Sequence, residues 1–102
     1  MMKAFTVAAV FAASTFTAGA ALAGPIDNAC MRSDRASASR SLCGCIQNVA
    51  NAMLTAQDQR LAAKFFTKPD MAQEVRMSKS AYHNEFWGRY KSFGAKAAAS
   101  CS

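Results

Sequence analysis

Apolar residues recur at helical spacing through most of the chain beyond residue 36. The clearest stripe lies on a helix expected over residues 36–54 and consists of Leu42, Ile46, Val49 and Met53. At about 100° per residue these positions fall within about 40° of Leu42, which is typical of a helix that faces a core. The polar side chains fall on the opposite side of the wheel: Arg40, Gln47, Asn48 and Asn51.

Residues that cap or interrupt helices divide the rest of the chain into four further helices. Ser, Thr, Asp and Asn favour N-caps, and proline favours the first helical position. We expect an extended lead-in at 24–26, a short helix capped by Asp27 or Asn28, a helix from the Thr55–Asp58 capping box through 66, a short helix that starts with Pro69, and a last helix over 81–99.

The last of these helices has the longest apolar face. Its inward positions are Tyr82, Phe86, Tyr90, Phe93 and Ala97. Glu85 and Arg89 are four residues apart on the exposed flank, and we expect them to pair. Gly88 and Gly94 each cost about 1 kcal/mol relative to alanine inside a helix. We therefore expect close helix packing or a binding surface beside them.

No segment alternates apolar and polar residues as a half-buried strand would. The pattern predicts an all-α fold, a small bundle of four to five helices. The core of so small a domain is marginal, and an even number of cysteines, four, favours a framework of disulfides. We expect these cross-links to decide whether the domain folds.

The helical geometry of Cys43 and Cys45 limits how the cysteines pair. The two are about 200° apart on the wheel, so their Cβ vectors diverge and a bond between them is disfavoured. Each is better placed to reach a different segment, and the other cysteines are Cys30 and Cys101. We favour Cys30–Cys43 with Cys45–Cys101. The pairing Cys30–Cys45 with Cys43–Cys101 stays open, and a Cys43–Cys45 bridge ranks third.

The first 23 residues have the pattern of a cleavable signal peptide. Lys3 precedes an Ala-, Val- and Phe-rich run, and Ala21-Leu22-Ala23 is an A-x-A cleavage site before Gly24. A glycine at position 24, where a lipid anchor needs cysteine, argues against lipidation. We expect residues 24–102 to be a single periplasmic domain with no transmembrane span, and a retained N-terminal anchor is the alternative.

The sequence argues against several classes of function. The chain has one histidine and no Gly-rich phosphate loop, and Asp58, Asp70 and Glu74 are better used at helix starts, so we expect neither an enzyme nor a cofactor. Aromatic and basic residues interleave over 86–93 as in single-strand nucleic-acid platforms. Helical spacing sends the aromatic residues to one side and Lys91 to the other, so we expect no nucleic-acid partner.

The best candidate for a binding surface surrounds the tryptophan. Trp87 is about 140° from Tyr82 on the wheel and lies off the aromatic face. An exposed tryptophan with cations around it can rest on an anionic envelope surface or on a protein partner. The candidate patch consists of Arg60, Lys64, Trp87, Arg89 and Lys91.

Two alternatives of another class concern the cysteines. Cys43-Gly44-Cys45 would be a redox site if it formed a strained short-loop disulfide. Redox pairs usually stand at a helix start, however, and this pair stands mid-helix. With His83 and the methionines the same thiols would offer soft ligands to copper or zinc. An edge histidine that makes a hydrogen bond is the simpler interpretation of His83.

Five blocks of sequence together resemble a family. They are Cys43–Gln47, Asp58–Arg60, Ala62–Phe66, Met71–Arg76 and Phe86–Gly94. The chain resembles small exported proteins of marine-type bacteria that sometimes carry the automatic label "arginine transporter", over nearly all of residues 24–102. A 79-residue chain without a membrane span cannot form a channel, and its net charge of +5 after loss of Lys3 is a poor environment for cationic arginine. The resemblance therefore implies at most a role accessory to solute uptake.

Overall fold

The computed structural model describes residues 24–33 and 38–101. All regular structure in these ranges is helical, which confirms the all-α fold. The helices are α2 (Pro25–Arg32), α3 (Arg40–Met53), α4 (Ala56–Thr67), α5 (Asp70–Arg76) and α6 (Ala81–Ser100). The predicted signal peptide and residues 34–37 lie outside the described residues.

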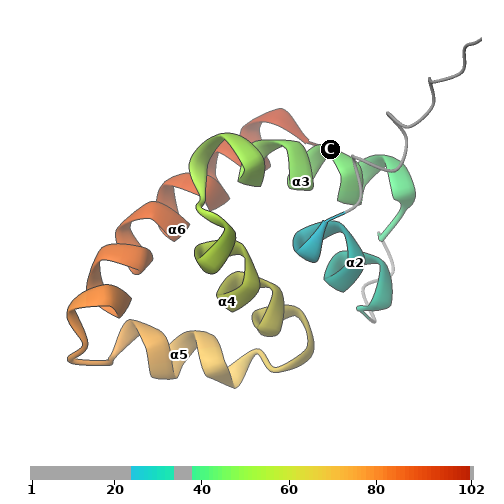
Figure 1. Ribbon diagram of the computed structural model, residues 1–102. Helices are drawn as coiled ribbons and strands as arrows, with labels where there is room; N and C mark the ends of the chain where they lie inside the picture. The colour runs from blue at the N-terminus through green and yellow to red at the C-terminus, as the bar shows by residue number, and fades with distance from the viewer. Residues whose placement is uncertain (1–23, 34–37, 102) are drawn as a thin grey trace, which may run out of the picture.

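Helix α4 lies at the centre of the bundle (Figure 1). It packs against α2 on one side and against α6 on the other, while α5 joins the far ends of α4 and α6. Helix α3 packs against both α2 and α6. All five helices contribute to one core, whose buried residues are Ile26, Ala50, Leu54, Ala62, Phe65, Val75, Phe86 and Phe93.

Three helices begin at polar residues whose side chains cap them, and the helices α4 and α6 begin where the sequence predicts. The Ser39 hydroxyl accepts the Leu42 N–H at the start of α3, at 3.1 Å. Thr55 and Asp58 form the capping box of α4 with both reciprocal hydrogen bonds. The Ser80 hydroxyl accepts the His83 N–H at the start of α6. Side-chain caps therefore fix where α4 and α6 begin, and α3 starts at Arg40, four residues after the expected position.

The start of α2 differs from the expected one. Residues 25 and 26 are helical rather than extended, and the N-cap is Gly24 instead of Asp27 or Asn28. Pro25 occupies the first helical position, where its fixed φ suits the helix and its missing N–H costs nothing. The helix therefore begins one turn earlier, and Asp27 becomes part of its first turn.

The two disulfides confirm the favoured pairing. Cys30 bonds to Cys43 and joins α2 to α3, and Cys45 bonds to Cys101 and joins α3 to the end of α6. The Cα–Cα distances are 5.6 and 5.8 Å, within the usual range for disulfides. Cys30 and Cys43 are buried, whereas Cys45 and Cys101 are partly exposed. Cysteines two residues apart on one helix thus reach partners on opposite sides of it.

The buried face of α3 is not centred on the predicted apolar stripe. Its fully buried residues are Cys43, Gln47 and Ala50, whereas Ile46, Val49 and Met53 are half-buried at its edge. Gln47, which the pattern placed on the polar side, is 1% exposed. The reason is that α3 has two neighbours, α2 and α6, so its contact surface is wider than one stripe.

Two glycines of α6 are not sites of close packing. Gly88 and Gly94 are exposed, and a Cβ at either position would meet nothing within 4 Å. The expectation that a neighbouring helix requires them is therefore wrong. Among the glycines in the described ranges, a neighbour constrains only Gly24, where a Cβ would lie 2.6 Å from Gln47 Oε1.

Candidate functional site

A buried ion pair joins α4 to α6. The Asp58 carboxylate, which is 0% exposed, receives two hydrogen bonds from the Arg89 guanidinium, at 2.7 Å from Nε and 3.0 Å from Nη2. The Tyr82 hydroxyl donates to the same carboxylate at 2.8 Å. The Thr55 N–H donates at 3.2 Å from the cap of α4. Asp58 therefore holds the start of α4 and the first half of α6 together. We call Asp58, Tyr82 and Arg89 the ionic cluster.

These contacts fix the protonation states of the ionic cluster. The hydrogen bond from Arg89 lowers the pKa of Asp58 to about 2, against the opposing effect of burial. Burial, followed by the hydrogen bond to Asp58, raises the pKa of Tyr82 to about 12. The same hydrogen bond to Asp58 raises the pKa of Arg89. At neutral pH the carboxylate is ionised and the phenol is protonated, so the cluster is built to hold two helices together rather than to transfer protons.

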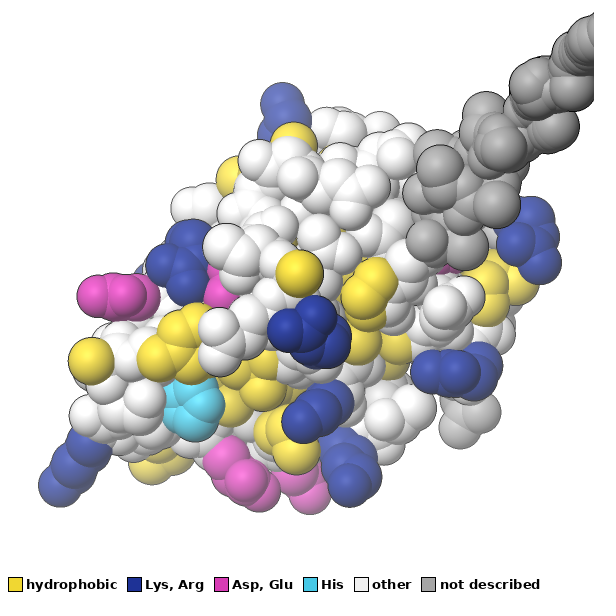
Figure 2. Space-filling view, in the orientation of Figure 1, with side chains coloured by type: hydrophobic (Ala, Val, Ile, Leu, Met, Phe, Trp, Pro, Cys, Tyr) yellow, Lys and Arg dark blue, Asp and Glu magenta, His cyan; other side chains and the backbone are white. Residues whose placement is uncertain are grey.

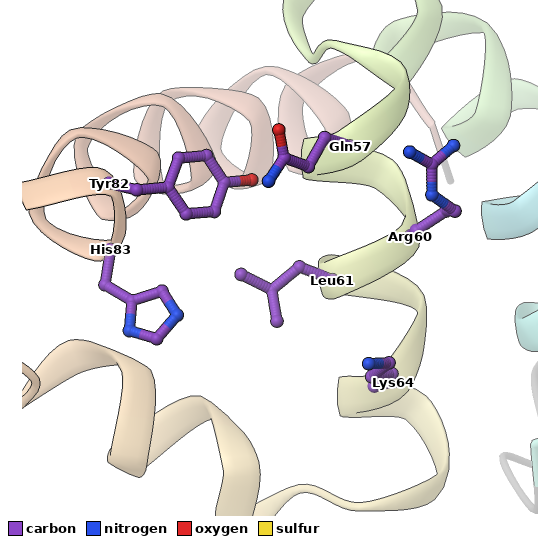
Figure 3. A pocket seen from close by; sticks show the side chains of 6 residues that line it. All are labelled: Gln57, Arg60, Leu61, Lys64, Tyr82 and His83. Carbon is purple, nitrogen blue, oxygen red and sulfur yellow. The ribbon is translucent and has the colours of Figure 1, made fainter. Parts of the chain in front are cut away.

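A shallow pocket of about 300 Å³ lies beside the ionic cluster, between α4 and the first turn of α6. Tyr82 and His83 extend from α6 toward α4, and Leu61 extends from α4 toward them (Figure 3). The other lining residues also come from α4 and are polar or cationic: Gln57, Arg60 and Lys64. The pocket thus combines an aromatic and apolar floor with a cationic edge. We call it the α4–α6 pocket.

The charges around this pocket are mainly positive. Dark blue Lys and Arg side chains gather over α4 at the centre of the face in Figure 2, beside exposed yellow hydrophobic side chains. Arg60 and Lys64 are exposed, and the one salt bridge among the described residues joins Arg89 to Asp58 instead. The two cations at the pocket edge are therefore available to an anion from solution.

His83 is held in place at the pocket. Its Nδ1 lies 2.8 Å from the Ser78 hydroxyl oxygen, so the expectation of an edge histidine with a hydrogen bond is confirmed. That contact occupies one ring nitrogen and leaves Nε2 as the second polar atom of the ring. Within residues 24–33 and 38–101, no group of three His, Cys, Asp or Glu side chains is arranged to hold a metal ion.

The structure divides the candidate patch into two parts. Arg60 and Lys64 line the α4–α6 pocket, whereas Trp87, Arg89 and Lys91 do not. Arg89 pairs with Asp58 rather than with Glu85, because the buried carboxylate offers it a bidentate contact and Glu85 is exposed. Trp87 is half-buried against Tyr90, and Lys91 is exposed on α6.

On the opposite side of α4, the side chains that form hydrogen bonds between helices are neutral amides. Gln47 Nε2 donates to Gln59 Oε1 at 2.7 Å and to Asn51 Oδ1 at 2.8 Å. Gln59 Nε2 lies 3.3 Å from the carbonyl oxygens of Ala50 and Leu54, at the end of α3. Gln47 Oε1 accepts the Asp27 N–H of α2 at 2.9 Å. We call Gln47, Asn51 and Gln59 the amide cluster, which joins α2, α3 and α4.

Sequence reasoning missed Gln57, Leu61, Tyr82 and His83 as parts of one pocket. A signal for the ionic cluster was present, since Tyr82 and Arg89 are seven residues apart and so share a face of α6. Nothing in the sequence indicated that this face would meet the first turn of α4. The pocket depends on that packing and emerges only in three dimensions.

Comparison of the chain with protein-family models, with curated proteins and with solved structures finds no match. Among the described helices, none is both long and apolar enough to span a membrane. Two disulfides agree with an extracellular or periplasmic location, where the redox conditions preserve them.

Proposed function

We propose that the chain is an exported periplasmic binding module whose signal peptide is removed after Ala23. The Ala21-Leu22-Ala23 motif before Gly24 and the two disulfides support export. The mass of the exported, unreduced protein tests this step. It should correspond to residues 24–102 with four fewer hydrogens than the reduced chain, because each disulfide removes two. A retained residue 1–23 segment, or four free thiols, would contradict it.

We further propose that the α4–α6 pocket binds a small organic anion, with a carboxylate or phosphate group joined to an apolar part. The observation that supports this is the set of Arg60 and Lys64 at the edge of a pocket whose inner surface includes Leu61 and the Tyr82 ring. A guanidinium binds carboxylate or phosphate oxygens in a bidentate manner, and the lysine adds a second positive charge. We propose a role accessory to solute uptake for such binding, which the sequence resemblance described above implies at most.

Titration with phenyl phosphate tests this pocket, because the probe carries both an anion and an aromatic ring. The double variant Arg60→Glu/Lys64→Glu should weaken binding at least about tenfold, since charge-assisted hydrogen bonds contribute about 1.5–3 kcal/mol each. The matched control is Lys79→Glu/Lys96→Glu, which changes the net charge equally at exposed positions outside the pocket. Equal weakening by both variants would mean that overall charge, rather than the pocket, attracts the anion.

Anionic vesicles separate the pocket from the wider patch. If the patch rests on an envelope surface, Trp87 fluorescence should change on addition of such vesicles, and Lys91→Glu should reduce the change as much as Lys64→Glu. If the pocket binds small anions, the vesicles should leave Trp87 unchanged while phenyl phosphate still binds. This experiment therefore distinguishes the two sources of negative charge.

The second candidate function is thiol redox chemistry or metal handling with Cys43 and Cys45. It rests on the partial exposure of the Cys45–Cys101 bridge, which a reductant in solution could reach. Thiol titration of the native protein tests it. The binding-module proposal predicts no reactive thiol without denaturant and strong reductant, whereas rapid reduction of Cys45–Cys101 by a mild dithiol would favour the redox function.

A further inference from the structure

One buried side-chain polar atom in the described part of the chain has no hydrogen-bond partner. It is Oδ1 of Asp27, in the first turn of α2, and the residue is 6% exposed. A buried carboxylate oxygen without a donor is costly, and such an atom in a folded protein calls for an explanation. The backbone N–H of the same residue is satisfied by Gln47, so the group without a partner is the side-chain Oδ1.

The start of α4 shows where that partner belongs. There the N-cap is Thr55, the third helical residue is Asp58, and the Thr55 N–H donates to Asp58 Oδ2 at 3.2 Å. Helix α2 repeats this spacing, with Gly24 as N-cap and Asp27 as third residue. In a capping box the third residue reaches back to the nitrogen of the N-cap residue. The group expected beside Asp27 is therefore the nitrogen of Gly24.

Gly24 is fixed against the fold at this point. The Asn28 N–H donates to its carbonyl oxygen at 2.9 Å, and a Cβ on Gly24 would lie 2.6 Å from Gln47 Oε1. This approach explains why a glycine stands here, since any larger side chain would displace the Gln47 amide. Gly24 is also the residue that directly follows the predicted cleavage site.

We propose that removal of the signal peptide creates the missing partner of Asp27, an ion pair between the new Gly24 ammonium and the Asp27 carboxylate. The inference rests on the proposed function, because it requires cleavage after Ala23. A membrane-bound signal peptidase hydrolyses the Ala23–Gly24 peptide bond. Water supplies the hydroxyl that makes the Ala23 carboxylate and a hydrogen for the Gly24 amine, which takes up a further proton at neutral pH.

After cleavage the Gly24 ammonium can pair with Asp27 better than the Gly24 peptide N–H can before cleavage. The amine carries three hydrogens and a full charge and turns freely about its bond to Cα, whereas the amide carries one hydrogen in a fixed direction. A positive charge at a helix N-terminus is unfavourable by itself. The Asp27 carboxylate offsets that charge, so removal of the signal peptide should stabilise the first turn of α2. The processed chain should be more stable than the same chain with its nitrogen in a peptide bond.

A thermodynamic cycle on the processed chain tests the coupling. Residues 24–101 contain every described helix and both disulfides, so the chain 24–102 carries the whole described fold. One form begins at Gly24, and the other carries one extra serine before Gly24, which moves the amine away by one residue. Both are made with Asp27 and with Asp27→Asn, and thermal unfolding is measured for the four proteins.

The serine extension should lower the unfolding midpoint by about 5–10 °C when Asp27 is present, and by less than about 2 °C in the Asp27→Asn background. An equal decrease in both backgrounds, or none in either, would overturn the ion pair. If Asp27→Asn does not fold, acylation of the Gly24 amine at neutral pH decides the matter. The amine should react at least about tenfold more slowly in the folded protein than in urea, because acylation requires the unprotonated amine. Equal rates would overturn the ion pair.

The mass of the exported protein shows where its N-terminus lies, and it therefore tests the cleavage separately from the ion pair. A chain that starts elsewhere than Gly24 would contradict the cleavage itself, and with it the inference. A chain that starts at Gly24 but shows no coupling in the cycle would contradict the ion pair alone. A chain that starts at Gly24 and shows the coupling supports both.

Discussion

Helix α4 is held to its neighbours by different side-chain chemistry on its two sides. Asp58 faces α6 and belongs to the ionic cluster. The next residue, Gln59, faces α2 and α3 and belongs to the neutral amide cluster. All three side chains of the amide cluster are neutral, and Gln47 and Gln59 are 1% and 7% exposed. On the ionic side the carboxylate is fully buried, but the Arg89 side chain is 38% exposed.

This difference indicates where a charged side chain can be buried in a domain of this size. Burying two ions costs several kcal/mol per ion unless good hydrogen bonds compensate. Arg89 keeps part of its guanidinium in water, so the ionic cluster avoids much of that cost. Gln47 and Gln59 are almost completely buried on the amide side, and uncharged amides satisfy one another there at a lower desolvation cost. The pocket lies on the side where α4 already meets solvent and charge.

The largest expected effects concern the two disulfides, one of which joins α3 to α2 and the other α3 to the end of α6. Replacing Cys45 and Cys101 by alanine should lower the free energy of unfolding by about 4 kcal/mol, and the same change at Cys30 and Cys43 by about 3 kcal/mol, because the first bridge closes the longer loop. Their sequence separations are 56 and 13 residues. Denaturant unfolding of both double variants measures the values. If the shorter loop proved more important, burial of Cys30–Cys43 would outweigh chain entropy.

Asp58→Ala should be the most damaging single substitution on the ionic side. It leaves Arg89 and the Tyr82 hydroxyl without their acceptor and removes the capping contact to Thr55. We expect a loss of about 3 kcal/mol, at the lower end for a broken buried pair because Arg89 still reaches water. Asp70→Ala is the matched control, since Asp70 is exposed in the first turn of α5 and should cost less than about 1 kcal/mol. Similar losses in both variants would mean that Asp58 acts only through its helix terminus.

Gln47→Leu tests the amide side. The substitution removes the acceptor of the buried Asp27 N–H and the donor to Gln59. We expect a loss of about 2 kcal/mol from the unsatisfied groups. Gln57→Leu, at an exposed position of α4, should change the free energy of unfolding by less than about 0.5 kcal/mol. A neutral result for Gln47→Leu would show that packing alone holds α2, α3 and α4 together.

Acid should weaken the ionic side selectively. The pKa of Asp58 is lowered in the folded chain to about 2 from its ordinary value of 3.8. The stabilisation is therefore fully present above about pH 5 and is lost as the pH falls through 3.8 toward 2, by about 1–2 kcal/mol. Denaturant unfolding between pH 6 and pH 2 measures the slope. Asp58→Ala should flatten this slope and Gln47→Leu should leave it unchanged; the same slope in both variants would assign it to other carboxylates.

Local chemistry made much of the fold predictable from sequence. Thr55 and Ser80 mark helix starts because their hydroxyls must satisfy backbone N–H groups within one turn, and that rule involves only nearby residues. The angle between Cys43 and Cys45 on one helix correctly disfavoured a bond between them, but it left two pairings with Cys30 and Cys101 open. Gln47 was placed wrongly because a buried, fully paired glutamine has the same pattern as an exposed one. Asp58 was assigned to its cap correctly, but its contact with Arg89 depends on how α6 crosses α4, which no local rule specifies.

The most direct test of the account is a map of amide chemical shifts during titration of the processed protein with phenyl phosphate. We predict that the shifts cluster at Arg60, Lys64 and His83 around the α4–α6 pocket, and that the shifts of α2 and of the amide cluster stay unchanged. Shifts centred on Trp87 and Lys91, shifts spread over every exposed cation, or no shifts at all would contradict it.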